Sequence, residues 1–262
     1  YMAFHHLSVQ LAKWLNAGVY ENVIYNGRDG IELSYLNPVI FYRAIEMQLG
    51  SGNSKATVGI DVKSNLFKTL QLYGDLVIGE FLFNDIKHYG RGSWWNKQAL
   101  QLGGKYIDVL GIKNLDLQAE INLVRPFMYT HNDSATAFTH YNTELAHPLG
   151  ANFKEYIAVL KYQPLNRLYL TGKLMYYKKG LDSAGVNMGG DIFRSYDTRP
   201  RDYGFFIGTG TPVTSLLASF SASYELLQNL FFDVSVANRS YNVQGQPKIN
   251  ELFFSTGVRW NI

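Results

Sequence analysis

The sequence of 262 residues contains no cysteine, few prolines and no long apolar run. The absence of cysteine excludes a disulfide framework, a thiolate zinc site and a cysteine nucleophile. No window approaches the ~20 consecutive apolar residues that a membrane-spanning helix needs. If the chain lies in a membrane, it must therefore cross as a β-barrel. The formal charge of +3 is spread along the chain, which gives nucleic-acid binding little support.

The residues that the chain has in abundance favour strands and turns. It contains 24 glycines, 19 tyrosines and 16 phenylalanines, and its mean hydropathy is −0.12. Aromatic residues are enriched in strands, and glycine is enriched in tight turns. Length and composition therefore predict one large all-β domain over residues 1–262, with nothing typical of disorder.

A period of two is clearest at residues 115–123, where apolar side chains occupy the odd positions and polar ones the even positions. Such alternation predicts a strand with one dry face and one wet face. Residues 55–63 and 251–262 alternate in the same way. Weaker candidates are 6–12, 17–25, 39–48, 70–79, 97–106, 155–162, 168–177, 216–226 and 230–238. The pattern predicts about twelve antiparallel strands of roughly 8–11 residues, the length that a tilted strand needs to cross a bilayer.

The links between these strands alternate in length. Counted back from the C-terminus, the long links are 239–250, 178–215, 125–154 and 80–96, and the short ones are 227–229, 163–167, 107–114 and 64–69. Outer-membrane barrels alternate short periplasmic turns with longer outer loops. A soluble β-sandwich has no physical reason to sort its loops in this way, so the rhythm favours a transmembrane barrel. The rhythm breaks at 26–37 and 49–54, where we expect a missed strand or a short helix.

The final eight residues resemble the C-terminal β-signal of bacterial outer-membrane barrels, which directs membrane insertion. The resemblance rests on a polar residue, a glycine and apolar residues at alternating positions: Ser255, Gly257, Trp260 and Ile262. Ile262 stands where an aromatic residue is commoner. Tyr1 begins without an initiator methionine or a signal-peptide pattern, so we expect a removed signal peptide or a missing N-terminal part. In the second case the strands belong to a larger barrel of up to ~18 strands.

Several segments are similar to a family of bacteroidete outer-membrane proteins that includes the gliding-motility protein RemB and is related to the capsule-assembly Wzi barrels. They are residues 21–25, 35–38, 72–75, 95–97, 120–126, 129–131, 145–152, 155, 189–192 and 196. The similarity covers most of the chain and corresponds to the C-terminal portion of such a protein. It implies an outer-membrane barrel with elaborate outer loops, and a role in capsule assembly or in gliding motility at the cell surface.

Segment 125–155 is dense in polar side chains and ring side chains, and it admits two interpretations. Aromatic faces and polar groups suit saccharide recognition. The candidate saccharide contacts, here and in the preceding loop, are Trp94, Trp95, Tyr129, His131, Tyr141, His147 and Asn152. Alternatively, Glu120, Arg125 and Glu155 form a charge network that folds the loop into the barrel lumen as a plug. For Trp94 and Trp95, a place in the aromatic girdle at the membrane interface is the simpler interpretation.

Motifs for catalysis and for cofactors are missing from the sequence. His131, His140 and His147 are separated by nine and seven residues, which matches no metal-ligand motif. The sequence contains no serine elbow, zinc-protease motif or phosphate loop. The charges of loop 178–204 are mixed, which is typical of a solvated loop, although a basic loop also suits acidic glycan or lipopolysaccharide phosphate. We therefore expect no enzyme, no metal and no cofactor.

These observations lead to a hypothesis about function and location. We expect a non-enzymatic barrel of the outer membrane, whose long outer loops bind or retain surface polysaccharide or support adhesion and gliding motility. The expected partners are outer-membrane lipid and lipopolysaccharide, capsular or surface polysaccharide, and other outer-membrane proteins. Two alternatives stay open: a structural subunit of a larger outer-membrane complex, and a diffusion channel.

Overall fold

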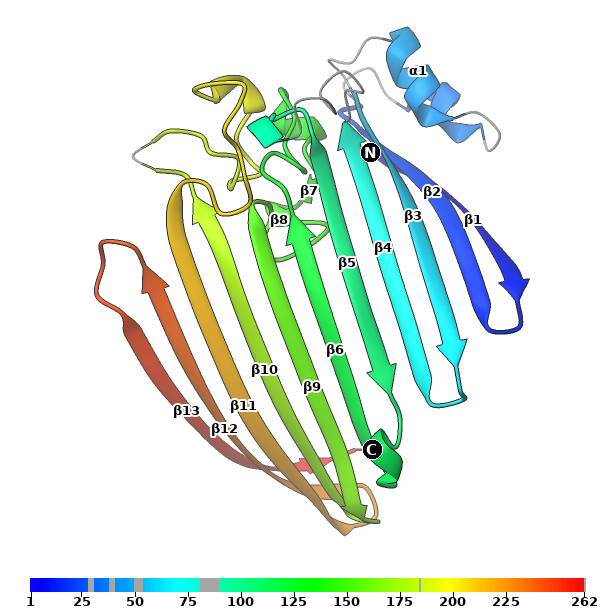
Figure 1. The fold of residues 1–262 in the computed structure, drawn as a ribbon, viewed down its shortest axis with the longest axis vertical. Helices are drawn as coiled ribbons and strands as arrows, with labels where there is room; N and C mark the ends of the chain where they lie inside the picture. The colour runs from blue at the N-terminus through cyan, green and yellow to red at the C-terminus, as the bar shows by residue number, and fades with distance from the viewer. Residues whose placement is uncertain (28–30, 38–40, 50–53, 81–89, 184, 262) are drawn as a thin grey trace.

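A computed structural model describes residues 1–27, 31–37, 41–49, 54–80, 90–183 and 185–261. Eleven long strands form one sheet in the order β1-β2-β3-β4-β5-β6-β9-β10-β11-β12-β13 (Figure 1). Their bounds are β1 Met2–Ala12, β2 Leu15–Tyr25, β3 Ser54–Leu66, β4 Leu70–Glu80, β5 Lys97–Tyr106, β6 Leu115–Val124, β9 Phe153–Leu165, β10 Leu168–Leu181, β11 Thr211–Leu227, β12 Leu230–Val243 and β13 Ile249–Trp260. The short strands β7 (Thr139–His140) and β8 (Thr143–Glu144) pair with each other.

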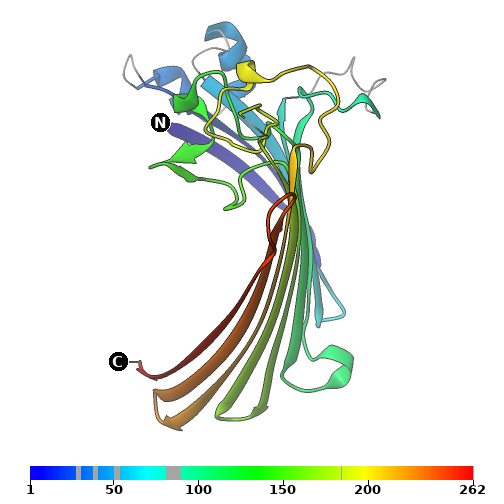
Figure 2. The same ribbon diagram turned by 90° about the vertical axis from the view of Figure 1, so that its left-hand side faces the viewer.

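The sheet is antiparallel throughout the part of the chain that the structure describes, and each strand pairs with its neighbours in the sequence order of the long strands. The predicted all-β, antiparallel architecture is therefore confirmed, with eleven long strands where about twelve were predicted. Figure 2 shows that the sheet curves into a trough, with the loops gathered over its concave side at one end. Strands β1 and β13 are the two edges of the sheet within the described residues.

The predicted strand at 39–48 is wrong, because Tyr42–Leu49 forms the helix α1. The short helix that was the alternative in the 26–37 link is present as the 3-10 helix Leu33–Leu36. Residues 26–53 thus form a single long connection between β2 and β3, and the break in the rhythm disappears. The connections at the upper end of Figure 1 are 26–53, 81–96, 125–152, 182–210 and 244–248, and those at the lower end are 13–14, 67–69, 107–114, 166–167 and 228–229. The predicted long link 239–250 is shorter than expected, because β12 runs to Val243 and β13 begins at Ile249.

The register of the strands separates a polar face from an apolar one. Thr171, Ser221, Ser235 and Ser255 lie directly opposite one another on β10 to β13 and form a row on the concave face. The next row along the strands points the other way, because successive side chains alternate between the faces. It consists of Gly172, Phe220, Val236 and Phe254.

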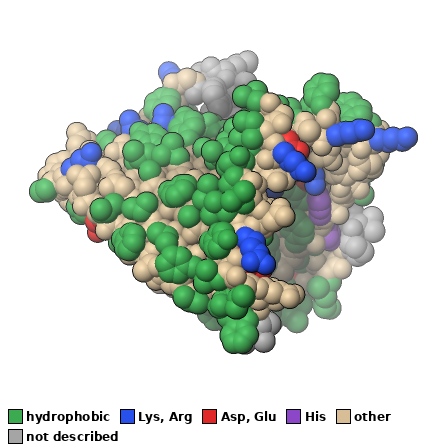
Figure 3. Space-filling model, turned by 90° about the horizontal axis from the view of Figure 1, so that it is seen from below, with side chains coloured by type: hydrophobic (Ala, Val, Ile, Leu, Met, Phe, Trp, Pro, Cys, Tyr) green, Lys and Arg blue, Asp and Glu red, His purple; other side chains and the backbone are tan. Residues whose placement is uncertain are grey.

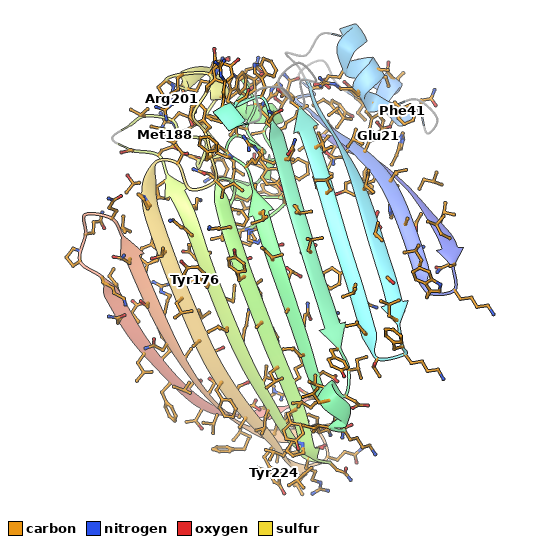
Figure 4. All side chains as sticks on the ribbon, viewed as in Figure 1. Glu21, Phe41, Tyr176, Met188, Arg201 and Tyr224 are labelled. Carbon is orange, nitrogen blue, oxygen red and sulfur yellow. The ribbon has the colours of Figure 1, made fainter. Side chains whose placement is uncertain are left out.

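Large apolar side chains on the convex face are exposed from β3 to β13. Phe220 is 49% exposed and Phe254 is 71% exposed. Others with the same orientation are Val58, Ile60, Leu72, Leu102, Leu160, Leu174, Leu216, Leu252 and Val258. Figure 3 shows hydrophobic side chains gathered over the lower ends of the wall, with few charged ones among them. Tyr176 and Tyr224 lie on this wall, away from the loop end where Met188 and Arg201 lie (Figure 4).

Helix α1 covers the upper ends of β2 and β3. Its residues Tyr42 and Ile45 are buried against Val23 and Ala56, which lie opposite each other on neighbouring strands. The backbone N–H of Tyr42 donates to the Glu21 carboxylate at 2.9 Å, and this bond helps to fix the start of the helix on the wall. Among the residues that the structure describes, no helix is long and apolar enough to cross a membrane.

Candidate functional site

The loops of the upper end pack into a layer on the concave face, and hydrogen bonds fasten this layer to the wall. Lys55 is 2% exposed, and its ammonium group donates to the carbonyl oxygens of Met128 and Thr130 at 2.8 and 2.7 Å. Since Lys55 belongs to β3, these bonds join the wall to the 125–152 loop. The loop therefore folds down onto the concave face.

Arg125 holds separate loops together. Its guanidinium donates to the carbonyl oxygens of Asn96, Ser93 and Phe205, at 2.7, 3.2 and 3.3 Å. The fork geometry of arginine suits several carbonyl groups at once. These bonds join the 125–152 loop to residues 93–96 and to Phe205. The pairing of Arg125 with Glu120 and Glu155 stays a prediction.

A stack of aromatic and basic side chains lies within the loop layer. Trp94 is 2% exposed, with the Arg199 guanidinium 3.7 Å from its ring centre and the Lys97 ammonium 4.8 Å from it. Lys97 also lies 4.1 Å from the centre of the Tyr196 ring and pairs with Glu80 at 2.9 Å. Cations over aromatic faces are stabilising, and more so when they are shielded from water. Burial raises the pKa of Tyr196 to about 12, so this phenol stays neutral.

His131 and Tyr129 are held in the same layer. His131 is 2% exposed and shares a hydrogen bond with the Thr136 hydroxyl. Burial lowers the pKa of His131 to about 4, with the nearby Lys55 charge as a further cause, so the ring is neutral near pH 7. Burial likewise raises the pKa of Tyr129 above its ordinary value.

Asn152 joins the loops at the top of β9 and β10. It is fully buried, and its side-chain amide donates to the carbonyls of Gly180 and Thr209, at 3.0 and 2.7 Å. Its side-chain oxygen accepts the backbone N–H of Gly208 at 2.7 Å. The hydrogen-bonding groups of this amide are thus occupied within the protein.

The remaining predicted saccharide contacts are more accessible. Tyr141 is 90% exposed and Trp95 is 38% exposed. His147 is partly exposed and lies beneath the loop layer, beside the wall. The structure therefore divides the predicted set. Trp94, Tyr129, His131 and Asn152 are buried within the loop layer, whereas Trp95, Tyr141 and His147 are accessible.

Glu120 and Glu155 lie on the concave face, and Asn122 bridges them. The Asn122 amide donates to Glu120 at 2.9 Å and to Glu155 at 3.1 Å. His147 Nδ1 accepts the backbone N–H of Leu149 at 3.1 Å, so Nε2 carries the proton and donates to Glu155 at 3.0 Å. A polar track therefore runs from the loop layer down the wall.

Two tyrosines on this face lie across glycines and reach carboxylates two strands away. The Tyr20 ring covers Gly59 on β3, and its hydroxyl donates to Asp75 on β4 at 2.6 Å. A Cβ at Gly59 would lie 2.1 Å from the Tyr20 ring, so only glycine leaves room for the ring. Tyr73 repeats the arrangement across Gly103 and donates to Glu120 at 2.7 Å.

Two cavities lie on the concave face, one on either side of His147. The first, of about 590 Å³, lies between β1–β6 and the loop layer, and its lining includes Tyr20, Asp61, Asp75 and His147. The second, of about 550 Å³, lies over β9–β12, and its lining includes His147, Glu155 and Arg239. Asp61 and Asp75 had no predicted site role. Alternation placed Asp61 on a wet face, but only the strand register brings it beside Asp75.

The predicted insertion signal lies in and just after β13. Ser255 and Gly257 face the concave side, and Trp260 faces the convex side with 70% of its surface exposed. Ile262 lies outside the described residues. The described residues contain no group of three or more histidine, aspartate or glutamate side chains arranged to hold a metal ion.

Comparisons with known proteins give matches among solved structures. No protein-family model matches the chain, and no curated protein matches it by sequence. The chain is similar to the outer membrane channel DcaP of Acinetobacter baumannii, with 8% identity and a TM-score of 0.47, over 97% of this chain and 61% of that one. It is also similar to the NanC porin, with 8% identity and a TM-score of 0.36, over 100% of this chain and 98% of that one. The chain thus spans 61% of the length of the DcaP channel.

Proposed function

We propose that the chain forms the wall of a non-enzymatic outer-membrane β-barrel and that its concave, lumen-side face binds saccharide. The observation that carries the membrane assignment is the row-by-row division of the wall. Apolar side chains such as Phe220 and Leu174 are about half exposed on the convex face, while serines and carboxylates line the other face. Soluble monomers rarely expose contiguous apolar patches beyond a few hundred Å². Lipid is the solvent that suits such a face.

Saccharide binding is supported by the chemistry of the concave face beside the loop layer. Tyrosine rings and carboxylates line both cavities, side-chain amides line the first, and His147 contributes to each. Aromatic faces cover the apolar side of a sugar ring, and amides and carboxylates bind its hydroxyl groups. The resemblance to the RemB and Wzi family supports a finer version, in which the ligand is capsular or surface polysaccharide and the protein serves capsule retention or gliding motility.

A diffusion channel is the second candidate function. Below the loop layer, the concave face carries short hydroxyl side chains on β11 to β13, including Ser221, Ser235 and Ser255. A polar face with short side chains suits a water-filled path along the wall. The same barrel then conducts small polar solutes instead of holding a glycan.

One preparation tests these proposals. Outer membranes from cells that express the protein are washed with alkaline carbonate and then extracted with mild detergent. The purified protein is analysed for bound saccharide and for bound protein partners. We expect carbonate-resistant membrane association and co-purified glycan. Release by carbonate contradicts the membrane assignment. Glycan-free protein with a steady single-channel current in a planar bilayer supports the channel, and fixed-ratio protein partners without glycan support a subunit of a larger complex.

A further inference from the structure

The first cavity contains buried polar atoms that have no partner. Asn22 and Thr57 lie directly opposite each other on β2 and β3, on the concave face, and both line this cavity. They are 3% and 1% exposed, and Asn22 Oδ1 and Thr57 Oγ1 lack a hydrogen-bond partner among the described residues. Buried polar atoms without a partner are rare, because each costs free energy. A ligand in the cavity can supply the missing donors.

Two carboxylates complete the polar side of the same cavity. Asp61 and Asp75 are register neighbours on β3 and β4. His6 bonds to Asp61 at 2.8 Å and offsets at most one of the two negative charges. Asp75 accepts the Tyr20 hydroxyl, which is neutral, and no ion pair joins it to a basic side chain in the described part of the chain. The cavity therefore carries a surplus of negative charge.

Nearby basic groups are directed elsewhere. Lys55 lies two residues above Thr57 on the same face, but its ammonium group is bound by the carbonyls of Met128 and Thr130. His147 donates to Glu155. Among the described residues that line the cavity, none is lysine or arginine. The lining thus offers acceptors to a ligand and contributes no strong cation of its own.

Aromatic rings form the remaining walls. Phe4 and Tyr20 lie 5.7 Å apart between ring centres, and Tyr129 and Phe138 lie 5.6 Å apart across the cavity's loop side. Aromatic faces attract ammonium groups and also cover the apolar face of a sugar ring. From the carboxylates, the unpartnered oxygens and the rings together, we propose that this cavity binds an amino sugar, with the protonated amine at Asp61 and Asp75 and its hydroxyl groups at Asn22 and Thr57.

This inference rests on the proposed saccharide-binding function and names its ligand class. The probes are glucosamine and N-acetylglucosamine, which share a ring but differ in charge at the nitrogen. Isothermal titration of the purified protein in detergent is expected to show glucosamine binding at least about tenfold more tightly, since a charge-assisted hydrogen bond is lost in the neutral sugar.

Two variants locate the site. Asp75→Asn keeps an acceptor for Tyr20 but removes the charge, so the preference for glucosamine is expected to disappear. Thr57→Val keeps the shape of the side chain and removes an oxygen that makes no bond in the protein. It is expected to weaken binding of glucosamine by a few-fold, with no loss of thermal stability. The matched control is Asp233→Asn on β12, which changes a carboxylate that pairs with Arg259 of β13 and leaves binding unchanged.

Several outcomes overturn the inference. Equal affinity for the two sugars shows that charge does not select the ligand. Unchanged glucosamine binding by Asp75→Asn and Thr57→Val places any binding elsewhere. Absence of binding to either sugar, in protein that resists carbonate extraction from outer membranes, removes the site and leaves the membrane assignment standing.

Discussion

The loop end and the lower wall of this molecule bury their apolar side chains in different ways. At the loop end, Trp94, Phe127 and Phe205 pack together with at most 2% of each residue exposed. On β13, in contrast, nearly every residue is exposed, including Leu252 and Phe254. The side chains at the loop end are buried within the protein, whereas the apolar side chains of β13 require a surrounding apolar phase. The molecule therefore has a core of the soluble type among its loops and a surface that suits lipid on its strands.

The largest effect is expected from a substitution in the buried core of the loop end. Trp94→Ala removes a buried ring that lies close to both Arg199 and Lys97, and we expect the loop layer to lose about 3–5 kcal/mol of stability. The measurement is limited proteolysis in detergent across a denaturant series, which reports opening of the loops. Trp95→Ala is the control, because Trp95 is 38% exposed and should cost much less. Equal protection of the two variants would show that the stack does not hold the layer.

The next effect tests the two faces of the wall on one strand. Phe220→Arg places a charge on the convex face near the middle of β11, and we expect a loss of about 2–4 kcal/mol in unfolding free energy in lipid vesicles. Ser221→Arg adds the same side chain at the next position, on the concave face, and should be much milder. Similar losses from the two substitutions would contradict the division of the faces.

Features that depend on local pattern could be predicted from the sequence. Side-chain alternation and loop rhythm gave the strands and their faces, because a period of two follows from strand geometry. The helix was missed although Tyr42, Ile45 and Glu46 have helical spacing, because apolar residues before them suggested a strand. Short apolar runs do not distinguish the two structures by periodicity alone.

Features that depend on strand register could not be predicted. Glu120 and Glu155 were expected to meet, but Asn122 as their bridge follows only from the pairing of β6 with β9. Likewise, Tyr20 reaches Asp75 across 55 positions of sequence. A shift of one residue in register would turn one of these side chains to the opposite face. Contacts of this kind require the pairing of specific residues on separate strands, which the period of each strand does not fix.

The smallest effect concerns acid release of the loop layer. Burial lowers the pKa of His131 to about 4, while an unfolded loop has an ordinary histidine pKa of about 6.5. The opened loop therefore binds a proton more readily, so the stability from neutral His131 is present above pH 6.5 and is lost as the pH falls toward 4. We expect a loss of about 1–3 kcal/mol over this window, seen as faster proteolysis of residues 125–152 at pH 5 than at pH 7. His131→Gln, which cannot be protonated, should flatten this dependence. An equally steep dependence in that variant would assign the acid response to another group and leave the packing of Trp94 as the main support of the loop end.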